Sequence, residues 1–388
     1  MDRQVCVLGV ISCPLVAGLQ IGQFWLSGGS AATRALLAGA VCPRVPGAGP
    51  GLAGRRSCLR SREVACMLVG VAGEPVRVSE VFEAERSWLF GLAYRLLGSA
   101  SDAEDVLQSA FERWIVADGT VVSPRTWLTT VVTNLCLKEL ASARRRRERY
   151  TGTWLPEPVV TSGGALGPLE TAEQRDSVSF AVLVLLERLS PAERAVFVLR
   201  EAFGYSYGEI AQVLGRSEAG CRQLHRRAGL RLGGPPRRVR PDRGQWRRLT
   251  EQFLAAAAGG DVAGLEQLFA EDAGYVGDGE GSGLPVARKP VAGRSRLARF
   301  FARVVPRYAA DPRFADVRLT VAEVNGQPAV LAWSRTSLLA VVILDADRGM
   351  IAALWLVVAP GKLAAAARQA VSLPVEESLP WAGVPSHG

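Results

Sequence analysis

The sequence predicts a multi-domain chain in which two all-α domains are followed by an α+β domain with an antiparallel sheet. Three observations predict this. The chain has 388 residues, which exceeds one ordinary domain. Capped amphipathic helical patterns fill residues 79–232, and short apolar runs separated by turn signals follow them. These runs span 315–324, 328–334, 337–345 and 350–358.

Composition excludes several classes of protein. Hydrophobic residues make up 48% of the chain and charged residues 21%, so packed cores are expected and a wholly disordered chain is not. No apolar run reaches the roughly 18 uncharged residues that cross a bilayer, so no membrane association is expected. The two histidines, His225 and His387, are too few for a multi-histidine metal site and argue against histidine-centred catalysis. We therefore expect no cofactor and no bound metal.

Residues 1–76 show no clear periodicity, and 38–62 are rich in glycine, proline and arginine. We expect a disordered extension, or a start assigned too early, with Met67 as the true first residue. Targeting is the second interpretation, because 5–19 form a short apolar run.

The seven scattered cysteines favour a reducing cytoplasm. Cys136 and Cys221 fall within helical patterns and are expected to be buried thiols.

Residues 77–150 are expected to form the first helical domain. Its first helix covers roughly 79–98, with apolar residues on one face. Ser101 opens the second helix, and Glu104 three residues later completes a capping box. Ser123, followed by proline, opens the third helix.

A linker, a second helical domain and a hinge are expected next. Prolines and glycines break the pattern in the linker, 151–177. Serine caps mark the helices of the second domain, 178–232, and a basic, proline-rich segment at 233–244 reads as a hinge. The capping residues are Ser190 with Glu193, Ser206 with Glu209, and Ser217.

Positive charge is concentrated in the second helical domain and the hinge. The chain carries a net charge of +9, and residues 178–248 hold 14 arginines against 6 acidic residues, a surplus of 8. Residues 77–150 carry +1 and residues 249–388 carry −1. Localised basic charge is typical of a module that binds nucleic acid, because neutralising phosphates releases counterions. A solvated basic surface is the alternative.

Residues 205–228 predict a helix-turn-helix. A capped helix reaches a tight turn at Gly215, and a second helix capped by Ser217 follows. At about 100° per residue, Cys221 and Ala228 fall on one stripe of that second helix, which we expect to be buried.

The opposite face of this helix carries Arg222, Gln223 and Arg226. Arginine suits guanine or phosphate, and glutamine suits adenine, so this face is expected to read DNA bases. Arg227 and His225 flank the face and are expected to touch the DNA backbone, and Ser217 at the start of the helix is expected to bind DNA as well. An arginine-rich surface helix without a DNA role is the alternative.

Residues 245–363 are expected to form the α+β domain, and 364–388 a tail. Asn325-Gly326 between two apolar runs is a strong hairpin signal, which makes the sheet antiparallel. The expected helices cover about 245–258, 261–271 and 293–305.

Residues 79–232 resemble the two conserved domains of extracytoplasmic-function sigma factors, the small bacterial RNA polymerase specificity subunits. Three motifs in order carry the resemblance: GSASDAEDVLQSAFERW at 98–114, SPRTWLTTVVTNLCLKEL at 123–140, and the helix-turn-helix. The resemblance implies that 77–150 is sigma region 2, which binds core polymerase and the −10 promoter element. It implies that 178–232 is sigma region 4, which reads the −35 element.

The same resemblance implies roles for single residues in region 2. Trp127 and Asn134 would lie at the separated DNA strands, although Trp127 as a core aromatic is the alternative. Arg144 and Arg145 would meet backbone phosphates, with a solvated charge run as the alternative. The residues implied to bind core polymerase are Asp102, Glu104, Asp105 and Gln108.

The rest of the chain resembles sigma factors fused to a SnoaL-like C-terminal domain. TWLPEP at 153–158 and NGQPAVL at 325–331 resemble markers of that group. Residues 278–282 resemble an altered form of its DGGGK segment, and 359–362 depart from its NPDK ending. The resemblance implies an NTF2-like fold, a curved sheet packed on helices.

The linker segment formed by Trp154, Leu155, Pro156, Glu157 and Pro158 is stiff and partly apolar. Burying a large apolar side chain is worth about 1.5–3 kcal/mol, so this segment would be costly to leave in water. We expect the C-terminal domain to dock against it and set the spacing of the two DNA-binding domains, in place of a separate anti-sigma protein.

The leading hypothesis is therefore a cytoplasmic sigma factor, with core RNA polymerase and promoter DNA as partners, regulated in cis by its C-terminal domain. The alternative is a helix-turn-helix regulator that senses a small-molecule ligand through that domain. Residues 79–150 separate the two, because a simple regulator needs no polymerase-docking helix. An enzyme is disfavoured, since the one histidine of the last domain, His387, lies in the tail. The sequence identifies no promoter, signal or ligand.

Overall fold

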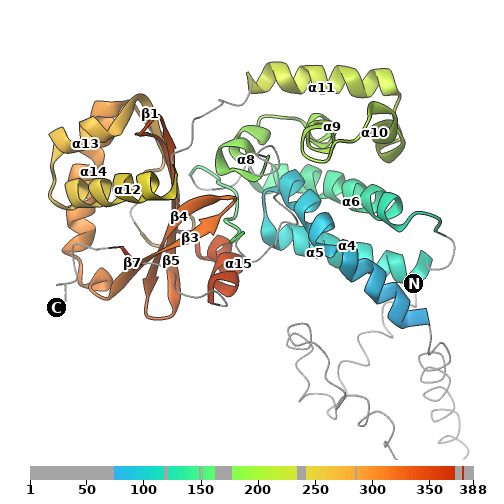
Figure 1. Ribbon diagram of the computed structural model, residues 1–388, viewed down its shortest axis with the longest axis horizontal. Coiled ribbons are helices and arrows are strands. Elements are labelled where there is room, and N and C mark those ends of the chain that lie inside the picture. Colours follow the sequence, from blue (N-terminus) through green and yellow to red (C-terminus); the bar gives the residue numbers. More distant parts are fainter. Residues whose placement is uncertain are drawn as a thin grey trace, which may run out of the picture. The chain divides into compact units, whose positions relative to one another are not determined.

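The computed structural model describes residues 74–117, 121–147, 150, 152–161, 177–233, 242–284, 286–371 and 378–379 (Figure 1). The expectations for residues 1–73, for 234–241 of the hinge and for 380–388 of the tail fall outside the described residues. In the part of the chain that the structure describes, no helix is long and apolar enough to cross a membrane.

The first helical domain contains α4 (Glu74–Leu97), α5 (Ala100–Ala117) and α6 (Pro124–Arg147). The apolar faces pack together as predicted, and Cys136 is buried among them. The predicted capping box of Ser101 and Glu104 is wrong. Gly98, with φ of 68°, ends α4, and the chain turns at once into α5. Ser99 is the residue that caps α5, because its Oγ accepts from the backbone N of Asp102 at 3.0 Å.

The second helical domain contains α8 (Phe180–Leu186), α9 (Pro191–Glu201), α10 (Tyr207–Leu214) and α11 (Glu218–Leu232). Complete capping boxes open α9 and α10, and Ser217 caps α11. Gly215, with φ of 60°, closes α10 in the left-handed conformation and makes the tight turn. The helix-turn-helix geometry predicted from the sequence is therefore present.

The two helical domains share one hydrophobic core. The buried guanidinium of Arg194 on α9 donates to the carbonyl of Leu96 on α4 at 2.9 Å. Tyr205 donates its hydroxyl to Thr129 of α6 at 3.2 Å. In this structure the domain that contains α11 is thus held directly against α4 and α6.

The C-terminal domain places three helices on one side of a seven-stranded sheet with the order β2-β1-β6-β5-β4-β3-β7 (Figure 1). Its helices are α12 (Arg243–Ala258), α13 (Val262–Leu268) and α14 (Arg294–Ala309), and α15 (Pro360–Val371) packs on the other side. The strands are β1 (Phe269–Asp278), β2 (Val291–Ala292), β3 (Val317–Val324), β4 (Gln327–Ser334), β5 (Ser337–Asp347), β6 (Met350–Val357) and β7 (Ser378–Leu379). Extra residues in β1, β5 and β6 mark bulges that curve the sheet.

Three details differ from the sequence prediction. Residues 364–371, expected to belong to a tail, continue helix α15, and Ser378–Leu379 form strand β7. The sheet is not purely antiparallel, because β1 pairs in parallel with β6. The helix predicted over 261–271 ends at Leu268, and the next residues, Phe269 to Asp272, belong to strand β1. Their local pattern is helical, but Phe269 pairs with Ile351 of β6, and the strand continues with Gly274 and Tyr275 paired to both β6 and β2.

Alternating side chains give the sheet two apolar faces. On β5, Val342 and Leu344 face helices α12 to α14, whereas Val341 and Ile343 face the opposite side. A cavity of about 190 Å³ lies on the helix-covered face. The opposite face packs against α15, the start of α8, and Leu155 of the linker.

Gly277 of β1 is required by close packing beside this cavity. A methyl group at this position would lie 2.5 Å from the Tyr275 hydroxyl and 2.3 Å from Val286 Cγ1. Gly277→Ala should therefore destabilise the C-terminal domain by about 1–3 kcal/mol, measured as a lower unfolding midpoint in calorimetry of the full chain. Gly274→Ala is the matched control on the same strand, because nothing lies within 4 Å of its added methyl group. Equal midpoints for the two variants would contradict this packing.

Candidate nucleic-acid interface and interdomain clamp

Helix α11 presents the predicted base-reading side chains to solvent. Cys221 and Ala228 are fully buried against α9 and α10, as the helical stripe predicted. The opposite face is exposed at each predicted DNA-binding position, namely Ser217, Arg222, Gln223, Arg226 and Arg227. Arg222 pairs with Glu218 one turn earlier, but both side chains are half-exposed and such a pair is weak enough to exchange for phosphate.

His225 is held by contacts within its own domain. Its Nδ1 lies 3.1 Å from the hydroxyl of Tyr207, and its Nε2 lies 3.0 Å from Glu201. The ring also stacks on Phe197, with centroids 5.9 Å apart. Both ring nitrogens are thus engaged within the domain, and contact of His225 with the DNA backbone stays a prediction.

The predicted strand-contacting residues lie on α6. Asn134 is exposed. Trp127 is half-buried, and its ring centroid lies 5.7 Å from that of Trp114. The Trp127 ring is therefore part of the domain's packing, with one portion left accessible. Arg144 and Arg145 belong to the last turn of α6, and their side chains are outside the described residues.

The predicted polymerase-binding residues lie at the start of α5. Asp105 and Gln108 are exposed. Glu104 forms an ion pair with Arg86 of α4, with 2.6 Å between the charged atoms. Asp102 is half-buried and occupies the first turn, where its carboxylate also suits the helix dipole. The structure therefore leaves Asp105 and Gln108 as the most available members of the set.

The linker is buried rather than solvated. Leu155 and Val159 are fully buried, Glu157 is 7% exposed, and Pro156 and Pro158 are buried with them. Trp154 is half-buried and lies against Gly98, where an added methyl group would be 3.0 Å from its ring. The docking of this segment on the C-terminal domain, expected from its apolar residues, is a feature of the structure.

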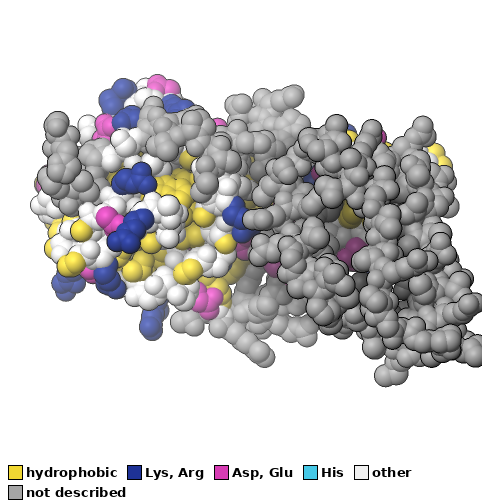
Figure 2. Space-filling model, turned by 90° about the horizontal axis from the view of Figure 1, so that it is seen from below, with side chains coloured by type: hydrophobic (Ala, Val, Ile, Leu, Met, Phe, Trp, Pro, Cys, Tyr) yellow, Lys and Arg dark blue, Asp and Glu magenta, His cyan; other side chains and the backbone are white. Residues whose placement is uncertain are grey.

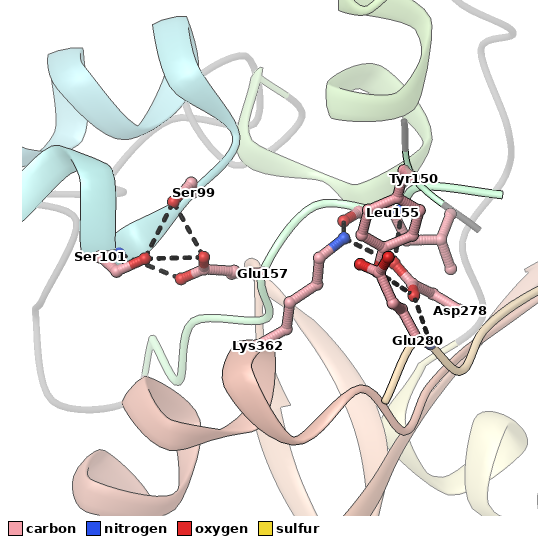
Figure 3. A network of polar contacts seen from close by, with 8 residues as sticks. All are labelled: Ser99, Ser101, Tyr150, Leu155, Glu157, Asp278, Glu280 and Lys362. Carbon is pink, nitrogen blue, oxygen red and sulfur yellow. Dashed lines mark hydrogen bonds and ion pairs between the residues drawn. The ribbon is translucent and has the colours of Figure 1, made fainter. Parts of the chain in front are cut away.

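Glu157 binds the beginning of α5 (Figure 3). Its carboxylate accepts from the backbone N of Ala100 at 2.9 Å and from that of Ser101 at 3.0 Å. It also accepts from the hydroxyls of Ser99 and Ser101, each at 2.8 Å. A carboxylate at a helix N-terminus satisfies free N–H groups and meets the positive end of the helix dipole. The linker thereby completes the capping of the helix that carries Asp105.

Leu155 is held from the other side by a buried ion pair. Nζ of Lys362 and Oδ2 of Asp278 lie 2.5 Å apart, with side-chain exposures of 10% and 0% (Figure 3). Lys362 donates to the Leu155 carbonyl at 2.6 Å, and the Leu155 backbone N donates to Asp278 at 2.9 Å. Tyr150 donates its hydroxyl to Asp278 as well. We call the pair Asp278–Lys362 with its bonds to Leu155 the linker clamp.

Asn325 joins all parts of the described chain at one point. Its Nδ2 donates to the hydroxyl of Tyr94 on α4 at 2.7 Å and to the carbonyl of Val178 before α8 at 3.0 Å. Its Oδ1 accepts from the Val159 backbone N at 3.2 Å, and its own N donates to the Val159 carbonyl at 2.9 Å. Burial raises the pKa of Tyr94, so its hydroxyl stays protonated and donates to the Glu157 carbonyl at 2.6 Å.

The sequence pointed to Asn325 as a turn residue and as the first residue of the NGQPAVL marker, but it gave Asn325 no bonding role and assigned no role to Tyr94. Asp278 and Lys362 could have been found, because they are the first residue of the altered DGGGK segment and the last of the altered NPDK ending. The altered positions are 280, 282, 359 and 361, and none of them is Asp278 or Lys362. The departures from the two motifs therefore leave the linker clamp intact.

Comparison with known proteins agrees with this geometry. The sigma-70 region 2 model matches residues 81–146, and the sigma-70 region 4 model matches residues 179–232. The chain is 43% identical over 235 residues to the ECF RNA polymerase sigma factor SigJ of Mycobacterium tuberculosis, covering 60% of this chain and 74% of that relative. The chain belongs to the extracytoplasmic-function sigma factors.

The likeness of this sigma factor to its relatives includes the C-terminal domain. It is 35% identical over 289 residues to "Probable ECF RNA polymerase sigma factor SigI" of the same organism, covering 74% of this chain and 94% of that one. The crystal structure of Mycobacterium tuberculosis SigJ matches with a TM-score of 0.58 at 35% identity, covering 74% of this chain and 98% of that chain. Helices α4 to α6 are thus region 2 and α8 to α11 are region 4, followed by a SnoaL-like domain.

A sigma factor binds core RNA polymerase and directs it to promoter DNA. If Gln223 reads a base, Gln223→Ala should relax base preference at one position, since a lost bidentate contact costs about 1–3 kcal/mol. Arg227→Ala should weaken binding evenly across sequences and flatten the dependence of affinity on salt. Binding of each variant to randomised duplexes, followed by sequencing, measures both effects. An unchanged base preference in Gln223→Ala would remove that assignment.

The exposed start of α5 yields a second test. Asp105→Arg should abolish co-purification with core RNA polymerase and leave the helix content in circular dichroism unchanged, because the side chain is exposed. Glu83→Arg, an equal charge reversal at an exposed position of α4, is the matched control and should bind core polymerase normally. Intact co-purification of Asp105→Arg would exclude the docking role.

Proposed function

We propose that this sigma factor selects promoters through α11 and α6, and that its C-terminal domain regulates it in cis by holding the linker between them. The observation that supports this is the linker clamp, since the clamp and Asn325 fix a buried segment that leads from region 2 to region 4. The domains would be region 2 at 77–150, the linker at 151–177 and region 4 at 178–232. The SnoaL-like domain, expected at 245–363, would extend from α12 to β7, over 243–379.

The proposed roles follow the exposure of the side chains. Gln223 and its arginine neighbours on α11 would read the −35 element, while Ser217 at the N-terminus of that helix would bind a phosphate. Asn134 and the accessible part of Trp127 would contact the separated strands at the −10 element. Arg144 and Arg145 would meet backbone phosphates, and Asp105 with Gln108 would bind core polymerase.

The packed arrangement must open for both promoter elements to be bound. Positions −10 and −35 lie about 25 base pairs apart, which is about 85 Å along B-DNA at 3.4 Å per base pair. Region 4 is bonded directly to region 2 through Arg194 and Tyr205, so the two reading surfaces cannot span that length in this arrangement. Asn325 and the linker clamp add contacts to the closed arrangement and therefore raise the free energy of opening.

The C-terminal domain acts by contact with protein rather than by catalysis or DNA binding. Residues 249–388 carry a net charge of −1. On the face shown in Figure 2, basic side chains are scattered among apolar and acidic ones and form no continuous patch. Among the described residues that line its cavity, none is an aspartate, glutamate, histidine, lysine or arginine that could act as a strong acid or base. The site of action would be the cytoplasm, where core polymerase is found.

A plain helix-turn-helix regulator is less well supported. Such a protein needs neither an exposed Asp105 on a docking helix nor a linker that caps that helix. The proposed regulation by the C-terminal domain depends on the linker clamp, so substitution of a clamp residue tests it.

Lys362→Met should increase transcription from a promoter selected by the wild-type holoenzyme. The variant removes the cation bonded to Asp278 and to the Leu155 carbonyl and so weakens the closed arrangement. Each roughly 1.4 kcal/mol lost from the closed arrangement raises the open fraction about tenfold. In vitro transcription with core polymerase measures the output, and limited proteolysis of the linker reports its release.

Lys289→Met is the matched control, because Lys289 is an exposed lysine of the same domain and its loss changes net charge equally. It should transcribe like the wild type. Equal output from Lys362→Met and Lys289→Met, with the linker cleaved faster in the former, would mean that the clamp holds the linker without regulating initiation.

A further inference from the structure

The cavity in the C-terminal domain is lined by apolar side chains from both layers and is partly open to solvent. It lies between helices α12 and α14 and the inner face of the sheet. Aromatic rings supply much of its helix side, and branched aliphatic side chains of β3 to β6 supply its floor. The aromatic members are Phe253, Tyr275, Phe300, Phe301, Tyr308, Phe314 and Trp355.

The cavity excludes ions. None of the described lining residues carries a charge at neutral pH. An ionised group placed against this lining would lose hydration without gaining a counter-ion, which is unfavourable. A ligand of this cavity is therefore neutral.

Within the described part of the chain, one polar group of the lining forms no hydrogen bond. Tyr275 is 3% exposed, and among the described residues no hydrogen-bond partner of its hydroxyl is found. The hydroxyl lies over Gly277, whose missing side chain leaves room for it. Thr250 is different, because its hydroxyl donates to the Trp246 carbonyl at 2.9 Å. Burial raises the pKa of Tyr275, so its phenol remains neutral and can both donate and accept.

Volume limits the size of the ligand. An apolar cavity of about 150 Å³ in another protein stays dry and binds benzene. This cavity has about 190 Å³, which accommodates one six-membered ring with one or two small substituents. Rings in the lining favour an aromatic ligand, since edge-to-face contacts add to the area buried.

We propose that this cavity is a binding site for a neutral, single-ring aromatic molecule with one hydroxyl or carbonyl group that pairs with the Tyr275 hydroxyl. The site is independent of the promoter-binding surfaces, and it requires no reaction. It lies on the strand that ends at Asp278, three residues beyond Tyr275, so the ligand would rest on the same strand that forms the linker clamp.

Three probes of one shape test the proposal on the wild-type full chain by isothermal titration calorimetry. Toluene and p-cresol differ by one hydroxyl, and 4-methylbenzoate carries a negative charge. We expect saturable binding of toluene, binding of p-cresol about 2- to 10-fold tighter through one added hydrogen bond, and no measurable binding of 4-methylbenzoate. Absence of saturable binding for both toluene and p-cresol would overturn the proposal, as would equal affinity for p-cresol and 4-methylbenzoate.

Two variants place the ligand in this cavity. Tyr275→Phe should bind toluene as before and lose the preference for p-cresol, and a retained preference would contradict the pairing with Tyr275. Ala332→Leu fills part of the cavity from the sheet and should weaken binding of both probes at least tenfold. Unchanged affinity in Ala332→Leu, with a normal circular dichroism spectrum, would place the ligand elsewhere. The comparison of probes on the wild type stands even if a variant fails to fold.

Discussion

A buried ion pair between Asp278 and Lys362 determines where the linker can lie. Two charges in an apolar interior recover their lost hydration only when further polar groups satisfy their remaining bonds. Here those groups are the backbone N and carbonyl of Leu155 and the hydroxyl of Tyr150. The pair and the linker therefore depend on each other, because either one alone would leave a polar group buried without a partner.

This constraint extends to the helical domains through the chain itself. With Leu155 fixed, Glu157 two residues later reaches the free N–H groups at the start of α5. Val159 then meets Asn325, which also bonds Tyr94 of region 2 and the carbonyl of Val178 at the entry to region 4. A small number of residues thus connects the three domains, and each of these residues forms hydrogen bonds to backbone groups as well as to side chains.

Local signals in the sequence predicted the elements that local physics determines. The capping boxes at Ser190 and Ser206, the exposed face around Gln223 and the Asn325-Gly326 hairpin all follow from spacing of a few residues. Strand β1 could not be predicted, because its conformation depends on pairing with β6, some 80 residues away in sequence. The linker clamp was visible only as two motif fragments, since ion pairs between distant residues leave no periodic pattern. The cap of α5 was misplaced for the same reason, as Ser101 bonds a glutamate 56 residues further on.

The length of chain between the linker and its clamp also matters during synthesis. Lys362 follows Leu155 by 207 residues, which a ribosome adds in about 10–40 s at roughly 5–20 residues per second. Early in this interval regions 2 and 4 leave the ribosome, and at that moment most of the sheet that buries the linker has yet to be made. A nascent chain therefore exposes Leu155, Val159 and the start of α5 without Glu157. In this state chaperones or core polymerase can bind the linker before the C-terminal domain covers it.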